Sequence, residues 1–154
     1  LAETDGTDPR ISFIKQLILD CGSEGDILVY NISFEQNIIE ELIQAFPGYQ
    51  IPLEGIIRRL KDLMEPFQKG WYYTPEMKGS YSIKQVLPAL VPELSYKQLN
   101  INEGGSASST FTSMANGTFE GDYDQTKKDL LEYCKMDTNA MVEILRVLRN
   151  RVNS

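Results

Sequence analysis

Residues 26–36 read Asp-Ile-Leu-Val-Tyr-Asn-Ile-Ser-Phe-Glu-Gln, a short apolar run that passes directly into a helix-forming segment. The run 26–30 lies between Gly25 and Asn31, and its length and apolar character predict a buried strand that is covered on both faces. Strands of this kind are typical of sheets that are packed between helices.

The segment after this run has the signals of a helix. Ser33 and Gln36 have the spacing of a capping box, and Pro47-Gly48 is placed to end the helix. The side chains predicted to face inward follow a spacing of four residues: Phe34, Ile38, Leu42 and Phe46.

A further helix is predicted before the strand, over residues 9–21, because Asp8-Pro9 is a helix start and Gly22 a helix end. Helix, buried strand and helix in this order indicate an α/β sheet protein. Residues 49–70 fit either a strand or a short helix. The rest of the chain predicts an aromatic loop over 70–81, a short helix from about Ser82, a surface loop with one short helix at most over 102–122, and a long helix over about 124–149.

Composition limits the function classes. The 154 residues are enough for one domain, and a net charge of −7 argues against a protein whose whole surface grips nucleic acid. Residues 51–90 nevertheless hold six basic and four acidic residues, which fits either a locally basic face or a mixed solvated surface. With no signal peptide and no membrane-spanning run, we expect a cytoplasmic protein that does not enter a membrane. Cys21 and Cys134 are expected to be reduced, half-buried thiols.

An acidic residue interrupts the apolar stripe of the last helix. The stripe runs through Leu130, Cys134, position 137, Met141, Ile144 and Leu148, and position 137 is Asp. A carboxylate on a core-facing stripe is costly without compensation. Two alternatives remain: an Arg or Lys partner, or a divalent metal ion, which prefers oxygen ligands. Tyr133 lies one turn earlier on nearly the same face.

A second polar group follows the predicted strand. Asn31 and Glu35 lie at its carboxyl end, where open α/β sheets bind their ligands. Each also has an ordinary explanation, Asn31 as a turn residue and Glu35 as an acid favoured by the helix dipole.

Together these two segments resemble a nuclease superfamily. Asn31-x-x-Phe34-Glu35 is similar to the second motif of the DnaQ-like, or DEDD, 3′–5′ exonucleases, and Tyr133-x-x-x-Asp137 is similar to their third motif in its tyrosine form. Nearly the whole chain resembles a bacterial family, domain of unknown function 2779. That resemblance rests on Tyr30-Asn31, on Phe34-Glu35 and on the segments 78–84, 86–92 and 133–137, whereas Arg59-Leu-Lys-Asp-Leu63 is similar to a segment between the exonuclease motifs.

The resemblance implies metal-dependent 3′–5′ hydrolysis of DNA or RNA, with four carboxylates holding two Mg²⁺ or Mn²⁺ ions. Asp137 and Glu35 would then be metal ligands that approach each other. Tyr133 would orient the attacking water, and Asn31 would brace the corner. The substrate-facing surface is expected in the basic and aromatic stretch 58–84, with four residues as candidates: Arg59, Lys78, Tyr81 and Lys84. The alternative is that the aromatic residues of this stretch fill core under a long loop.

The chain departs from the family pattern in two ways. Glu35 replaces the usual Asp, and the first motif, Asp-x-Glu on an opening strand, is absent, since Glu3, Asp5 and Asp8 lie on no apolar strand. The fold implied is therefore an incomplete ribonuclease H-like α/β domain. Residues 1–154 would be its C-terminal portion, helix-rich because the N-terminal strands are missing.

Such a fragment is expected to be inactive and to bind metal weakly or not at all. It is also expected to self-associate through its exposed strand edge, or to lay residues 1–8 along that edge. A rival interpretation remains: a non-catalytic domain that uses the exonuclease fold to bind nucleic acid or a partner protein.

Overall fold

A computed structural model describes residues 7–152, so Glu3 and Asp5, and most of the segment 1–8, lie outside the described residues. The chain divides into two compact units. We call Asp8–Tyr73 the strand unit, and the part from Thr74 onward the long-helix unit. The expectation that both belong to one exonuclease-like domain stays a prediction, and each unit is described by itself.

The strand unit contains all the strands found among the described residues. Its elements are α1 (Arg10–Cys21), β1 (Ile27–Val29), α2 (Ile32–Ala45), the 3-10 turn η1 (Pro47–Tyr49), α3 (Gln50–Ile57), β2 (Leu60–Asp62) and α4 (Glu65–Gln68). The ambiguous stretch 49–70 therefore contains both a helix and a strand.

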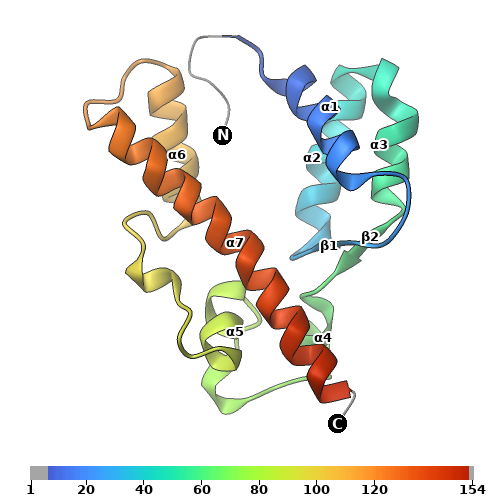
Figure 1. The fold of residues 1–154 in the computed structure, drawn as a ribbon, viewed down its shortest axis with the longest axis vertical. Helices are drawn as coiled ribbons and strands as arrows, with labels where there is room; N and C mark the ends of the chain where they lie inside the picture. Colours follow the sequence, from blue (N-terminus) through green and yellow to red (C-terminus); the bar gives the residue numbers. More distant parts are fainter. Residues whose placement is uncertain (1–6, 153–154) are drawn as a thin grey trace. The chain divides into compact units, whose positions relative to one another are not determined.

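β1 and β2 pair in parallel, with Ile27 opposite Leu60 and Val29 opposite Asp62. Figure 1 shows the three longer helices of this unit, α1 to α3, side by side with the strand pair at one end. The predicted strand is confirmed, but only Val29 is buried, while Ile27 and Leu28 are half-buried. Because the two strands are parallel, their carboxyl ends lie together, next to the N-terminus of α2.

The first two helices of this unit, α1 and α2, begin and end close to the predicted positions. Asp8 accepts a hydrogen bond from the backbone N–H of Arg10 at 3.0 Å, and Gly22 ends α1 with a φ of 55°. The buried core cluster combines the helices with both strands: Ile14, Val29, Ile39, Leu42, Leu53, Ile56 and Leu60.

The predicted inward face of α2 was right only in its second half, where Leu42 is buried and Phe46 packs against the core cluster. Phe34 is 63% exposed and Ile38 is 40% exposed, whereas Ile39 and Leu42 are buried. A strict four-residue spacing drifts by about 40° per step around a helix of 3.6 residues per turn, so that stripe cannot stay on one face. The capping box was also wrong, because α2 begins at Ile32, before Ser33.

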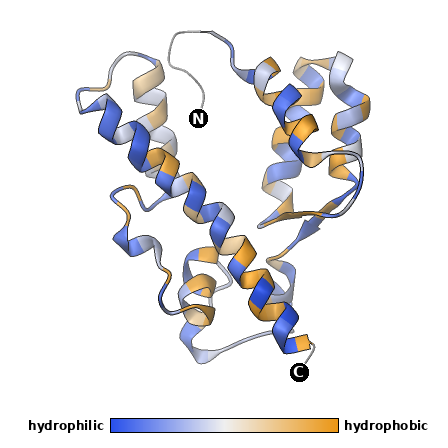
Figure 2. Ribbon diagram, in the orientation of Figure 1, coloured by the Kyte–Doolittle hydropathy of each residue, from blue (hydrophilic) through white to orange (hydrophobic). Residues whose placement is uncertain are grey.

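The long-helix unit, as described, has only helices and 3-10 turns as its regular elements. Its elements are the 3-10 turn η2 (Pro75–Met77), α5 (Ile83–Leu90), the 3-10 turn η3 (Tyr96–Gln98), α6 (Gly104–Ala115) and α7 (Tyr123–Val152). α5 and α6 both contact α7. Figure 2 shows polar and apolar residues distributed around α7, and its buried side chains are Leu130, Ala140 and Ile144.

Residues 102–122 depart from the expectation of a loop with one short helix at most, because α6 runs for 12 residues. Its Gly and Ser residues favour helix weakly, but it packs against α7, and tertiary packing supplies most helical stability in proteins. Several of its hydroxyls donate to carbonyls of the preceding turn, as Ser113 does to Ser109 O at 3.0 Å.

Two further observations concern the chain as described. Within residues 7–152 no helix is long and apolar enough to cross a membrane. Cys21 and Cys134 are both free thiols, as expected, but Cys134 is exposed rather than half-buried.

Candidate functional site

The strand unit carries a carboxylate corner, which we define as Asn31, Glu35 and Asp62. Glu35 lies in the first turn of α2, and Asp62 ends β2. Asn31 follows β1 in a left-handed conformation with a φ of 80°. The parallel pairing brings all three to the carboxyl edge of the two strands, the edge predicted from the sequence.

Asp62 is the structural centre of this corner. Its Oδ1 accepts hydrogen bonds from Asn31 N at 3.0 Å and Met64 N at 2.9 Å, and its Oδ2 accepts one from Ile32 N at 3.0 Å. Asp62 lies on the neighbouring strand β2, and its carboxylate accepts backbone N–H groups at the start of α2. It therefore takes the role of an N-cap residue for this helix. The sequence prediction did not name it as a site residue, although it lies two residues after the apolar residue Leu60.

Glu35 differs sharply from Asp62. Its side chain is half-buried, and its Oε2 is buried without a hydrogen-bond partner among the described residues. Burial raises the pKa of Glu35, a hydrogen bond from its own backbone N–H lowers it, and the negative charge of Asp62 raises it further. Burial, and then the charge of Asp62, also raise the pKa of Tyr30. An orphaned carboxylate oxygen beside a second acid is the environment that a cation would stabilise.

The long-helix unit carries the second group, which we call the Asp137 cluster: Lys84, Tyr96, Tyr133 and Asp137. Tyr96 Oη donates to Asp137 Oδ1 at 2.7 Å, and the rings of Tyr96 and Tyr133 lie 6.0 Å apart. Lys84 Nζ lies 5.6 Å from the centre of the Tyr96 ring and 5.7 Å from that of Tyr133. A Cβ on Gly104 would lie 3.4 Å from Tyr133 Oη, so α6 begins close to this phenol.

These neighbours compensate the burial of the Asp137 carboxylate on the apolar stripe of α7. Burial raises the pKa of Asp137, while the Tyr96 hydrogen bond, the Lys84 charge and the Tyr133 hydrogen bond lower it in that order. Burial and the Asp137 charge raise the pKa of Tyr133 to about 12. The cationic partner considered from the sequence is present in Lys84, but Tyr96, which the sequence prediction missed, donates the hydrogen bond.

Glu35 and Asp137 lie in different units. Each carboxylate is therefore described with its own neighbours, and their approach stays a prediction. Within residues 7–152 no group of three or more His, Cys, Asp or Glu side chains is placed to hold a metal ion. The donors differ in their fit to a hard cation: Glu35 Oε2 fits, whereas both oxygens of Asp62 already accept backbone N–H groups.

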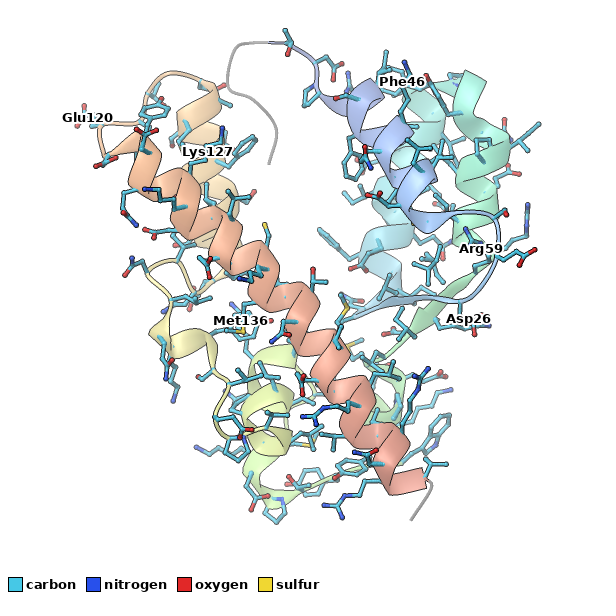
Figure 3. The ribbon with its side chains drawn as sticks, viewed as in Figure 1. Asp26, Phe46, Arg59, Glu120, Lys127 and Met136 are labelled. Atoms are coloured by element: carbon cyan, nitrogen blue, oxygen red, sulfur yellow. The ribbon has the colours of Figure 1, made fainter. Side chains whose placement is uncertain are left out.

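The residues predicted to face substrate have different surroundings. The guanidinium of Arg59 donates to the carbonyls of Cys21, Gly22, Glu24 and Gly25 at 2.8 to 3.0 Å. Arg59 lies at the end of α3 beside the loop that follows α1 (Figure 3). These contacts give Arg59 a structural role, and its predicted contact with substrate stays a prediction. Lys78 and Tyr81 are exposed, and Lys84 is half-buried and donates to Asn102 O at 2.7 Å.

No solved structure matches the chain significantly. Among curated proteins, the chain is 30% identical over 140 residues to the uncharacterized protein UU173 of Ureaplasma parvum serovar 3, which covers 80% of this chain and 20% of that protein. It is 32% identical over 130 residues to the uncharacterized protein MG366 homolog of Mycoplasma pneumoniae, which covers 76% of this chain and 19% of that protein. The chain thus spans about a fifth of the length of these bacterial relatives.

The family comparison covers the strand unit and the start of the long-helix unit. Residues 1–82 match the family model described as "Domain of unknown function (DUF2779)". This match includes the whole carboxylate corner and ends just before α5. It covers more than half of the chain, which therefore belongs to the DUF2779 family.

Proposed function

We propose that this chain is part of a metal-dependent 3′–5′ exonuclease that hydrolyses phosphodiester bonds of DNA or RNA. The observation that carries the proposal is the half-buried Glu35, whose Oε2 is buried without a partner at the carboxyl edge of a parallel strand pair. An unpaired carboxylate oxygen costs folding free energy, and a site that binds a cation is a reason for a protein to keep it.

In this proposal, Glu35 and Asp137 would each be a ligand of a divalent ion, and bound ions would supply an activated water and stabilise the leaving oxygen. Tyr133 keeps its proton at neutral pH, as an ordinary phenol does, and burial and the Asp137 charge raise its pKa further, to about 12. It can therefore donate a hydrogen bond to a water held near Asp137. Tyr96 and Lys84 favour the ionised form of Asp137, the form that binds cations.

The rival proposal is a non-catalytic module that binds nucleic acid or a protein. Two observations favour it: residue 35 is Glu where the resembled motif has Asp, and residues 7–152 contain no group of three possible metal ligands. The two proposals differ in one measurable property, the metal-dependent release of nucleotides.

The test uses the longer protein that we expect to contain this chain. Oligonucleotides labelled at the 3′ or the 5′ end are incubated with Mg²⁺ or Mn²⁺, and the products are separated by length. We expect nucleotides to be released from the 3′ end. Glu35→Gln and Asp137→Asn should each lower kcat by about 100-fold or more, the scale on which losing one transition-state charge contact acts.

Two matched controls lie on the same helices. Glu41→Gln on α2 and Glu132→Gln on α7 neutralise exposed acids and should leave kcat unchanged. An inactive wild-type protein with either metal, or an Asp137→Asn variant as fast as wild type, would contradict the exonuclease and favour the binding module.

A further inference from the structure

A pocket of about 430 Å³ opens in the long-helix unit next to the Asp137 cluster. Its lining comes from the turn after η2, from α5 and from η3. The polar residues that line it are Lys78, Ser80, Lys84, Gln85, Ser95 and Lys97. Three lysines contribute to this lining and no acidic residue does, in a chain whose net charge is −7.

Two of these lysines have no internal counter-charge. Among the residues that the structure describes, Lys78 and Lys97 form no salt bridge, whereas Lys69 pairs with Glu65 and Arg58 with Glu54. Lys84 is engaged differently, because it donates to Asn102 O and its charge acts on Asp137. The pocket thus presents two uncompensated ammonium groups beside a third that reaches the Asp137 cluster.

The two serines add hydrogen-bond donors. Ser80 Oγ accepts from Ser82 N at 3.2 Å, and Ser95 Oγ accepts from Lys97 N at 3.3 Å. A hydroxyl that accepts a backbone N–H still has its own proton to donate. The lining is therefore rich in donors, which suits an anion with several acceptor oxygens.

The backbone at Lys78 gives an independent indication. Lys78 has a φ of 52° and is followed by Gly79 with a φ of 76°. The left-handed region is unfavourable for a lysine and easy for glycine. A strained residue that carries an exposed charge into a pocket indicates that its side chain is used there.

We infer that this pocket binds a backbone phosphate of a single nucleic-acid strand, so that Lys84 links the phosphate subsite to Asp137. The choice of a nucleic-acid strand rests on the proposed function, whereas the phosphate chemistry rests on the lining alone. Lysines recognise a phosphate as point charges, so the subsite should bind strands of different sequence equally well.

The test measures binding of this chain to a fluorescein-labelled single-stranded oligonucleotide by anisotropy, at low salt and without divalent ions. The pocket variant is K78G/K97Q, in which glycine removes the charge of Lys78 and keeps the turn. The control is K128Q/K135Q, which makes the same charge change at exposed positions of α7.

We expect the pocket variant to bind several-fold more weakly than both wild type and control. The slope of log Kd against log salt should fall by about 0.7 for each lysine–phosphate contact removed. Thermal melts should show the pocket variant folded, since both substituted lysines are exposed.

Competitors identify the source of the phosphate. An unlabelled strand should compete, whereas inorganic phosphate and a polyglutamate peptide at equal charge concentration should not. Equal weakening in pocket and control variants, or no binding by wild type, would overturn the inference. Competition by inorganic phosphate would overturn the strand assignment, and competition by polyglutamate would overturn the phosphate assignment. Binding that survives in Glu35→Gln while cleavage is lost separates this inference from the proposed function.

Discussion

Asp62 in the strand unit and Asp137 in the long-helix unit are both half-buried carboxylates, but their partners differ in kind. Asp62 accepts three backbone N–H groups, at Asn31, Ile32 and Met64. Asp137 accepts from the Tyr96 phenol and is stabilised by Tyr133 and Lys84. Backbone donors are fixed by the fold, whereas the partners of Asp137 are side chains, of which Tyr96 is itself buried. Asp62 is therefore a structural cap, while a chemical role for Asp137 stays a prediction.

Glu35 sharpens this contrast within one corner of the molecule. It lies on the same strand edge as Asp62 and has a buried oxygen without a partner. Asp62 should therefore stabilise the fold, while Glu35 should cost stability that its proposed function requires. The following predictions run from the largest expected effect to the smallest.

Asp62→Ala should lower the free energy of unfolding by about 2 kcal/mol, because three backbone N–H groups lose a charged acceptor and α2 loses its cap. Urea denaturation followed by circular dichroism measures this change. Asp26→Ala, at an exposed position just before β1, is the matched control and should have little effect. Equal losses in both variants would remove the structural role assigned to Asp62.

Tyr96→Phe should lower the free energy of unfolding by about 1 kcal/mol, since one hydrogen bond to a carboxylate is lost. It should also raise the pKa of Asp137, because the Tyr96 hydrogen bond is the largest effect that lowers it. A carbon-13 NMR titration of the Asp137 carboxyl group reports this shift. The control Tyr123→Phe removes a phenol hydroxyl that donates to Met114 O, and it should leave the pKa of Asp137 unchanged. An unchanged pKa in Tyr96→Phe would mean that Lys84 and Tyr133 stabilise the carboxylate without Tyr96.

Glu35→Gln should raise the free energy of unfolding at pH 7 by up to about 1 kcal/mol, since it removes the cost of a partly desolvated charge. The folded pKa of Glu35 is raised. Its contribution to stability is therefore fully present below the unfolded pKa, about 4.3, and is lost as pH rises through the folded pKa. The free energy of unfolding, measured from pH 4 upward, should fall less steeply with pH in the variant than in wild type. Glu41→Gln on the exposed side of α2 should keep the wild-type slope, and a destabilised Glu35→Gln would contradict the contrast with Asp62.

Local signals in the sequence were enough to identify several elements. Asp8-Pro9 and Gly22 delimit α1, the apolar run 26–30 contains β1, and the long periodic segment near the C-terminus is α7. The polar anomalies at Glu35 and Asp137 were also visible, because a carboxylate stands out among apolar neighbours. The ribonuclease H-like architecture and the approach of the two carboxylates stay predictions.

Where the sequence misled, the deciding contacts were distant along the chain. The start of α2 depends on Asp62, which lies 30 and 31 residues from the N–H groups that it accepts. The partner of Asp137 is Tyr96, 41 residues away. Arg59 is held by carbonyls 34 to 38 residues earlier.

The sequence by itself determined which segments are helix or strand wherever periodicity, capping residues and turn residues agreed, because those preferences act between residues a few positions apart. Only the tertiary structure decided that Asp62 caps α2, that Arg59 holds a loop, that Asp137 pairs with a phenol, and that α6 is a helix. The physical reason is that a carboxylate or guanidinium forms hydrogen bonds with whichever groups the fold brings within about 3 Å. The spacing of residues along the chain does not predict which distant groups those are.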